Sequence, residues 1–344
     1  MVSFVAVAVW IAMLAAFYAL STFLESRAAM RGSHRKPMPP WVDKSIRVFF
    51  LLTFLMPVYI VCPWPWVFLA VLVAYLPTYL DEGEKTGKRA SNFVRNLPIW
   101  RFIKWYFTLE MEMPHGPLDS SKKYVIGLHP HGFLPFATMI GVLTDVCDIR
   151  KRLLPCVHLR TLAASFCFYI PGYRDLILGG GIIDAARYNA HNALEQGLSI
   201  ALVPGGATEG LYASPGKHIL VLKKRKGFVK LAMEHGADLV PSYSFGETDC
   251  YNQLSDAWPP IKKFQAKFQR VLGLSLPLVT NLIPHRAKIT VVWGKPIPVK
   301  KNPKPTDAEV QALLDIYIER LREHFDEFAP KYIAKPEQRK LEIL

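Results

Sequence analysis

Two histidines separated by a proline are the sharpest chemical feature of this 344-residue chain. His129-Pro130-His131-Gly132 directly follows residues 123–128, an apolar run that predicts a buried strand. Ligands usually bind at the carboxyl ends of the strands in α/β sheets. Imidazole titrates near neutrality, so a histidine at such a strand end can accept a proton from an alcohol. We therefore take His131 and His129 as candidate catalytic residues, with Gly132 allowing a close approach of backbone or substrate.

Two other interpretations of these histidines stay open. They are typical of a structural pair at a turn, and His-x-His can also chelate zinc. A zinc site needs one or two further ligands, and the remaining histidines have no ligand-like spacing. No metal is therefore expected.

A glycine-rich turn follows a second predicted strand, residues 199–203. In Pro204-Gly205-Gly206-Ala207-Thr208-Glu209-Gly210, the glycines at 205 and 206 permit tight turns whose N–H groups suit a phosphate or an oxyanion. Glu209 is placed to orient a histidine and to stabilise its protonated form. The turn matches neither a P-loop nor a dinucleotide-binding fingerprint, so by itself it is weak evidence.

Four cations, Lys223, Lys224, Arg225 and Lys226, precede a helix predicted over residues 227–234. Cations beside a helix N-terminus favour a phosphate-bearing ligand, although a solvated charge run is the alternative. The sequence contains no Gly-x-Ser-x-Gly elbow, so nothing indicates a covalent serine enzyme.

Strands alternating with helices must position these residues. The predicted strands are residues 123–128, 199–203, 238–243 and 288–293, and the predicted helices are residues 185–196, residues 227–234 and a last helix that starts at Thr306. Glu309 completes a capping box with Thr306. This alternation predicts an α/β domain whose sheet is largely parallel and flanked by helices.

Composition indicates a lipid environment. The chain is 51% hydrophobic with a formal net charge of +14, a balance that suits an anionic partner. No nucleic-acid module is recognisable, so nucleic acid is excluded and the lipid bilayer is preferred. The five cysteines show neither zinc spacing nor a disulfide framework, which is typical of thiols facing the cytosol.

Two long uncharged runs predict membrane segments. Residues 1–25 form a membrane-anchoring or transmembrane helix, 26–47 a basic cytosolic linker, 48–80 a membrane hairpin broken near Pro63 and Pro65, and 81–344 a cytosolic, membrane-associated domain. The basic residues that flank the hairpin place both flanks in the cytosol. A signal peptide for the first run and a kinked single span for the second are the alternatives. Residues 261–278 predict a basic amphipathic helix that lies either in a membrane surface or on the core.

Taken together, these blocks resemble the type 2 diacylglycerol acyltransferase family, from about Leu80 to Pro330. The matching blocks are, in order, His129-Pro130-His131-Gly132, the Gly205–Glu209 block, Lys224–Ala232, His235–Pro241 and Tyr243–Glu247. The family is similar to glycerolipid acyltransferases with a His-x4-Asp pair, but Phe136 stands where that Asp would follow His131. The resemblance therefore moves the orienting carboxylate to Glu209. It also implies a glycerolipid acyltransferase-like fold preceded by N-terminal membrane helices that include a hairpin.

The resemblance implies direct acyl transfer from acyl-CoA to diacylglycerol, without a cofactor. His131 would be the general base, Gly132, Gly205 and Gly206 the oxyanion site, and Lys224, Arg225, Lys226 and Arg187 the acyl-CoA-binding residues. Monoacylglycerol and long-chain alcohols are alternative acceptors, and a non-catalytic lipid-binding protein is the alternative outside the enzymes. The implied location is the endoplasmic reticulum membrane, with a cytosolic catalytic domain, or the lipid droplet. The oligomeric state is open, a homo-oligomer included.

Overall fold

The computed structural model describes residues 65–148, 158–257, 260–272, 278–281 and 284–344. The chain divides into two compact units. The first comprises residues 1–82 and 97–105, and the second residues 83–96 and 106–344. The predicted segments 1–25 and 26–47, and most of 48–80, lie outside the described residues.

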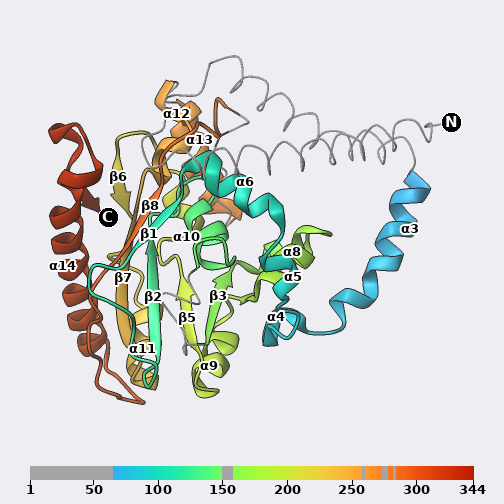
Figure 1. Cartoon of the computed structure of the whole chain (residues 1–344), viewed down its shortest axis with the longest axis horizontal. Coiled ribbons are helices and arrows are strands. Elements are labelled where there is room, and N and C mark those ends of the chain that lie inside the picture. The colour runs from blue at the N-terminus through green and yellow to red at the C-terminus, as the bar shows by residue number, and fades with distance from the viewer. Residues whose placement is uncertain (1–64, 149–157, 258–259, 273–277, 282–283) are drawn as a thin grey trace. The chain divides into compact units, whose positions relative to one another are not determined.

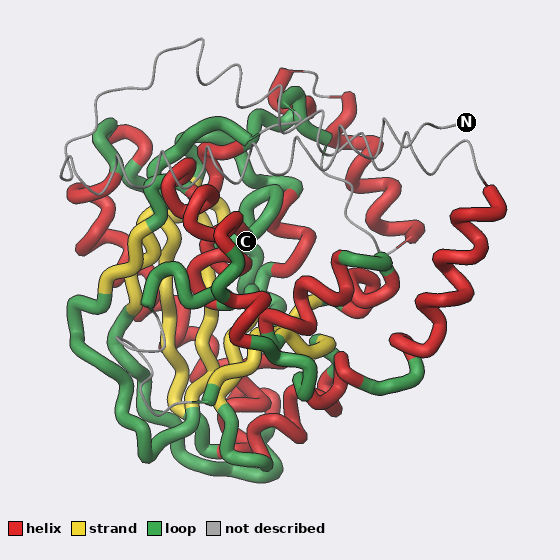
Figure 2. The backbone as a smooth tube through the Cα atoms, turned by 45° about the vertical axis from the view of Figure 1, so that its right-hand side comes forward, coloured by secondary structure: helices red, strands yellow, loops and turns green. Residues whose placement is uncertain are grey.

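The second unit contains a seven-stranded sheet in the order β1-β8-β7-β2-β5-β3-β4 (Figure 1). Its strands are β1 (Glu110–Glu112), β2 (Tyr124–His129), β3 (Leu159–Ala163), β4 (Ile182–Asp184), β5 (Ser199–Leu202), β7 (Asp238–Phe245) and β8 (Thr290–Trp293). Every pairing is parallel except β7 with β8. The predicted α/β class and largely parallel sheet are therefore confirmed. Figure 2 shows these strands side by side in one layer.

All four predicted strands exist, whereas β1, β3 and β4 were not predicted. The whole of β2 and of β7 is buried. Strands buried on both faces read as continuous apolar runs, and such runs are the easiest to recognise. The three that were missed are short and lie toward the edges of the sheet, where burial is incomplete.

Helices cover the sheet. They are α4 (Gly83–Thr86), α5 (Asn92–Arg95), α8 (Tyr173–Gly180), α9 (Arg187–Glu195), α10 (Gly206–Gly210), α11 (Gly227–His235), α12 (Leu254–Ala257), α13 (Pro260–Leu272) and α14 (Asp307–Tyr332). One hydrophobic core joins α9, α11 and α14 to strands such as β2 and β5, through residues such as Leu194, Val229 and Leu314. The predicted helices over 185–196 and 227–234 are thus confirmed as α9 and α11.

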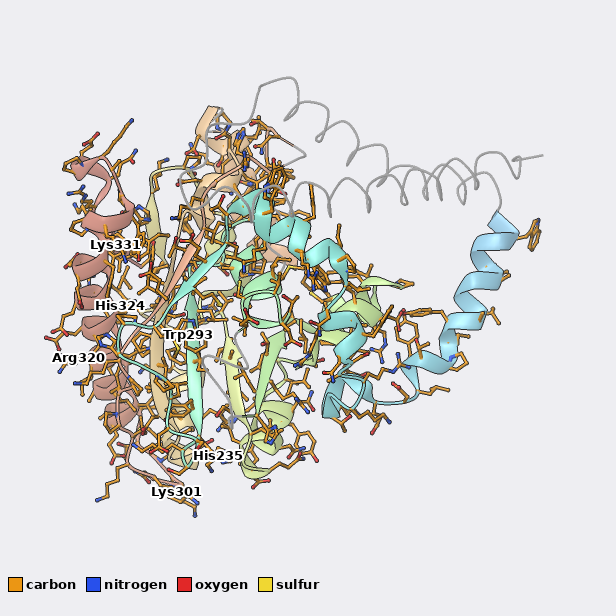
Figure 3. The ribbon with its side chains drawn as sticks, in the orientation of Figure 1. His235, Trp293, Lys301, Arg320, His324 and Lys331 are labelled. Atoms are coloured by element: carbon orange, nitrogen blue, oxygen red, sulfur yellow. The ribbon has the colours of Figure 1, made fainter. Side chains whose placement is uncertain are left out.

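The last helix begins as predicted. Thr306 is its N-cap, its side chain accepts from the Glu309 N–H, and the Glu309 carboxylate bonds back to the Thr306 N–H at 2.7 Å. Its inner side carries Tyr317 and His324, and the His324 Nε2 donates to the Val292 carbonyl at 3.0 Å. Figure 3 shows His324 toward the strands and Arg320 on the outer side of the helix.

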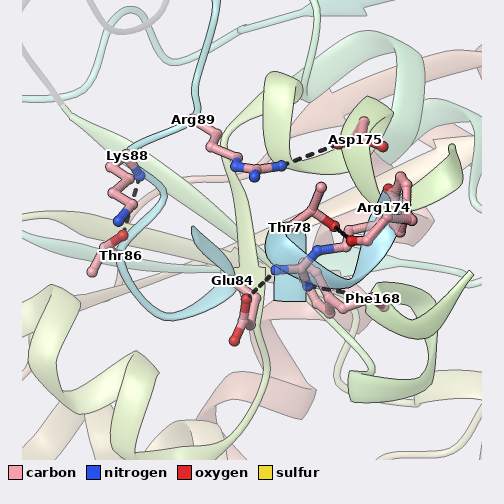
Figure 4. A network of polar contacts seen from close by, with 9 residues as sticks. Thr78, Glu84, Thr86, Lys88, Arg89, Phe168, Arg174 and Asp175 are labelled. Carbon is pink, nitrogen blue, oxygen red and sulfur yellow. Dashed lines mark hydrogen bonds and ion pairs between the residues drawn. The ribbon is translucent and has the colours of Figure 1, made fainter. Parts of the chain in front are cut away.

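Two ion pairs tie α8 to the chain segment around α4. The Arg174 Nη2 lies 2.6 Å from the Glu84 Oε2, and the Arg89 Nη1 lies 3.1 Å from the Asp175 Oδ1 (Figure 4). The Arg174 side chain is only 2% exposed, so this guanidinium needs its charged partner.

A second sheet pairs β6 (His218–Leu220) with β9 (Leu341–Ile343) in parallel. The Leu344 carbonyl then accepts from the N–H groups of Leu222 and Lys223. Hydrogen bonds from the end of the chain therefore hold in place the segment that leads from β6 to the cations.

The first unit holds α3 (Pro65–Tyr75), a 3-10 turn and α6 (Pro98–Phe107). Trp66 is 78% exposed and Val73 57% exposed. Of the helices that the structure describes, none combines the length and the apolarity needed to cross a bilayer. The predicted membrane helices are therefore not supported by the described residues.

Candidate active site

The histidine motif and the glycine-rich turn meet because the strands that carry them are neighbours. β2 pairs with β5 in parallel, with Gly127 opposite Leu202. The segments that follow the two strands therefore emerge at the same edge of the sheet. There the Glu209 Oε2 accepts from the His131 N–H at 3.3 Å. The structure thus brings together two predicted residues that are 78 positions apart in the sequence.

Glu209 contacts the backbone of His131 and not its ring. The His131 Nδ1 lies 3.0 Å from the Gly132 carbonyl oxygen. A carbonyl only accepts, so Nδ1 carries the proton and the neutral ring keeps its free lone pair on Nε2. Burial lowers the pKa of His131, while the bond to Gly132 raises it. A neutral imidazole with a free Nε2 is the form that a general base needs.

Glu209 is 1% exposed and lies in the short helix α10. Its second oxygen, Oε1, accepts from the Val221 N–H at 3.3 Å. Burial raises the pKa of Glu209 to about 8, against the effect of these two N–H groups and of the Arg225 charge, which lower it. The carboxyl therefore joins the motif after β2 to the segment after β6, and it titrates near neutral pH.

His129 is fully buried and pairs with a residue that the sequence did not single out for chemistry. Its Nε2 lies 2.9 Å from the Tyr317 hydroxyl of α14, and burial lowers its pKa to about 3. A Cβ at Gly127 would collide with that hydroxyl, so the glycine makes room for it. His129 therefore stays neutral and is placed to position the loop. Tyr317 is buried on α14, and its hydroxyl was the signal in the sequence that could have found it.

Glu247 is a second buried carboxyl beside the motif. Its Oε2 accepts from the Ala137 N–H at 3.0 Å, and burial raises its pKa to about 8. Gly132 has a φ of +65°, and a Cβ there would lie 3.1 Å from the Glu247 Cγ. Gly132 is therefore required by both conformation and space. Glu247 stands in a block that carried the resemblance, but sequence reasoning assigned it no role.

The cationic segment contributes one residue to the turn. The Arg225 Nη2 donates to the Gly205 carbonyl at 3.1 Å and to the Thr208 hydroxyl at 3.0 Å. Lys224 is exposed and Lys226 is half-buried, just ahead of α11. Arg225 thus holds the glycine-rich turn, while the two lysines face outward beside it.

Both glycines of the turn are needed for its shape. A Cβ at Gly205 would collide with the Glu209 carboxyl, and Gly206 has a φ of +57°. The Gly206 N–H already donates to the Val203 carbonyl at 3.0 Å. Gly206 is therefore set aside as an oxyanion donor, and the N–H groups of Gly205 and Gly132 remain the candidates.

Arg187 stands apart from this group. Its guanidinium pairs with Glu234 at 2.6 Å, near the last residue of α11, whereas Arg225 precedes the first residue of that helix. A nine-residue helix spans roughly 13 Å. Within the described part of the chain, no three His, Cys, Asp or Glu side chains gather to hold a metal ion.

Comparisons with known proteins agree with the motifs. A family model described as "Diacylglycerol acyltransferase" matches residues 58–343. Diacylglycerol O-acyltransferase 2 of Xenopus tropicalis is 33% identical over 333 residues, covering 87% of this chain and 90% of that protein. 2-Acylglycerol O-acyltransferase 1 of Bos taurus is 36% identical over 281 residues, covering 75% and 82%.

One solved structure is a distant match. It is the crystal structure of a 1-acyl-sn-glycerophosphate acyltransferase from Thermotoga maritima, with a TM-score of 0.38 and 16% identity, covering 78% of this chain and 90% of that chain. The family model alone spans most of the chain. The chain belongs to the diacylglycerol acyltransferase family.

Proposed function

We propose that this protein transfers the acyl group of acyl-CoA to the free hydroxyl of diacylglycerol, forming triacylglycerol. Family membership supports the reaction class, and the printed names of the relatives support the acceptor. The observation that carries the chemistry is His131, a partly buried imidazole at a strand end whose Nε2 is left to accept a proton.

In the proposed reaction, the His131 Nε2 takes the proton of the acceptor hydroxyl as its oxygen attacks the thioester carbonyl. The new C–O ester bond forms, the C–S bond breaks, and the proton passes from the imidazolium to the leaving thiolate of CoA. The N–H groups of Gly205 and Gly132 would stabilise the oxyanion. Lys224 and Lys226 would bind CoA phosphates, and Arg225 would hold the glycine-rich turn beside those phosphates. We assign no cofactor or metal to this reaction.

Glu209 would act mainly by holding the loop, because its contact with His131 is through the backbone N–H. Burial raises the pKa of Glu209 to about 8, so near neutral pH the carboxyl is largely protonated and adds little charge beside the ring. We therefore expect a smaller effect from Glu209→Gln than from removing the imidazole.

The test compares His131→Ala, Glu209→Gln and an exposed control, Glu337→Gln, in microsomes given labelled oleoyl-CoA and diacylglycerol. General base catalysis is worth roughly 10²–10⁴-fold, so His131→Ala should lose at least that factor. Glu209→Gln should lose less, and Glu337→Gln should keep wild-type activity. Near-normal triacylglycerol synthesis by His131→Ala would end the proposal.

A second acceptor is favoured by one of the relatives, which is named for 2-acylglycerol. Monoacylglycerol and hexadecanol, offered in parallel with diacylglycerol, decide this point. The proposal expects the highest kcat/KM for diacylglycerol.

The proposed location is the endoplasmic reticulum membrane, with the catalytic unit in the cytosol, or the lipid droplet. The apolar sequence of α3 and the exposure of Trp66, Leu69 and Val73 support contact with lipid. Such side chains on a solvated helix would otherwise be a costly exposed patch.

A further inference from the structure

A pocket lies at the end of the sheet opposite to His131. It has a volume of about 700 Å³ and is walled by α9, by the end of α11, by Lys123 before β2 and by Lys301 after β8. Lys123 precedes β2 and His131 follows it, and a six-residue strand spans roughly 20 Å. Figure 3 shows His235 and Lys301 at the same end of the domain. The pocket is therefore separate from the candidate active site.

The acidic residues of this pocket already have partners. Glu234 pairs with Arg187 at 2.6 Å, and Glu195 lies 3.2 Å from the His191 Nε2. Lys123 and Lys301 differ from these acidic residues in their partners. The Lys123 Nζ contacts the Leu194 carbonyl at 3.4 Å, and no described carboxylate pairs with either Lys123 or Lys301. The pocket thus holds two cations that an anion would neutralise.

Two imidazoles in contact extend this site. The His235 Nε2 lies 2.7 Å from the His191 Nδ1, with the rings edge to face. One of these two nitrogens must donate and the other accept, so a single proton lies between the two rings. Burial and the nearby charges of His191 and Lys123 lower the pKa of His235, while Glu195 and Glu234 raise it. A bound anion would favour the positively charged form of His235.

We propose that this pocket binds the phosphate group of a phosphorylated ligand, between Lys123, Lys301 and the His191–His235 pair. A volume of about 700 Å³ lies within the usual range of small-molecule sites, roughly 300–1,000 Å³, and exceeds what one inorganic phosphate needs. The exposed ring of Tyr188 adds an apolar surface beside the cations for the rest of the ligand. The site would be a regulatory one, since it lies away from His131.

The test uses the full-length protein purified in detergent and titrated with inorganic pyrophosphate at constant ionic strength in a calorimeter. Wild-type protein should bind in a saturable manner at this pocket, in addition to any binding at Lys224 and Lys226 of the candidate active site. Lys123→Gln/Lys301→Gln should bind at least about tenfold more weakly, because two charge-assisted contacts to the phosphate are lost. Lys304→Gln/Lys340→Gln removes the same charge from exposed positions outside the pocket and should bind like wild type.

A second experiment distinguishes a soluble phosphorylated ligand from a lipid headgroup. Wild-type protein and the pocket variant are sedimented with vesicles of phosphatidylcholine, with or without phosphatidic acid. Binding of pyrophosphate that depends on the pocket lysines supports a soluble ligand. A dependence seen only with phosphatidic acid supports a lipid headgroup at the same site. If neither probe binds, or if the pocket variant binds both as tightly as wild type, the proposal is wrong.

These binding assays do not require turnover, so they remain informative if the protein fails to transfer acyl groups. Folding of each variant is checked by its thermal unfolding midpoint. Lys301 is exposed and Lys123 half-buried, so both variants should unfold within a few degrees of wild type.

Discussion

At the scale of single residues, the candidate site depends on buried groups that are held by backbone and hydroxyl partners. Glu209 binds two N–H groups, His129 binds a tyrosine hydroxyl, and Glu247 binds the N–H of Ala137. A buried polar group is costly when its partner is lost. These contacts therefore fix the position of the loop that carries His131.

The first prediction concerns the hydroxyl that pairs with His129. Tyr317→Phe keeps the ring and removes the partner of the His129 Nε2, a donor or acceptor with no access to water. We expect the free energy of unfolding to fall by about 1–3 kcal/mol, measured by urea denaturation. Tyr188→Phe changes an exposed tyrosine in the same way and should have no measurable effect. Equal stabilities for the two variants would contradict the assigned bond.

The second prediction is a pH dependence of stability. Glu247 has an ordinary pKa of 4.5 and a folded pKa of about 8. Between these values the folded chain holds a proton that the unfolded chain has lost, so this group lowers stability as pH rises. Glu247→Gln cannot ionise, so its stability relative to wild type should increase with pH, by up to about 1.4 kcal/mol per pH unit.

Denaturation of both proteins at pH 5, 6, 7 and 8 measures this difference. The exposed Glu337→Gln serves as the control and should run parallel to wild type. A constant difference between Glu247→Gln and wild type would show that Glu247 does not hold a proton in the folded state.

At the scale of elements, the packing of β2 against α14 positions the histidine motif at the end of β2. Gly127 is the residue of β2 that faces the Tyr317 hydroxyl, and no Cβ fits there. Sequence periodicity alone presents this glycine as a weak point in a strand. In the folded domain, the absence of a Cβ at Gly127 leaves room for the Tyr317 hydroxyl to bond to His129.

The third prediction follows from that contact. Gly127→Ala should displace Tyr317 and cost about 1–3 kcal/mol, the usual penalty of overpacking a core. Gly227→Ala, at the first residue of α11, meets open space and should be neutral or slightly stabilising. Thermal unfolding of the two variants tests this, and a stable Gly127→Ala would mean that α14 can shift at little cost.

Element prediction from the sequence succeeded where local signals were strong. The capping box of Thr306 and Glu309 located the start of α14, and continuous apolar runs located β2 and β7. The three-residue strands β1 and β4 carry no such pattern, since edge strands are short and partly exposed.

At the scale of the whole molecule, the proposed contact with lipid rests on α3 and on the uncharged runs. Our fourth prediction places a photo-crosslinking amino acid at Leu69, which is 50% exposed on α3, in full-length protein in microsomes. It should attach to labelled phospholipid on illumination. The same amino acid at Ile316, 44% exposed on α14, should not. Equal labelling at both positions would remove the special role of α3.

The sequence by itself determined the family and the reaction class, and it supplied the candidate residues of the site, because several motif blocks stand in the family's order. The tertiary structure decided the partners of those candidates. It joined Glu209 to the backbone of His131, paired His129 with Tyr317, brought Arg225 to the glycine-rich turn and placed Arg187 in the pocket at the other end of the sheet. Local sequence patterns report the periodicity of one element at a time. Contacts between side chains arise from strand order and helix packing, which bring distant residues within hydrogen-bonding distance.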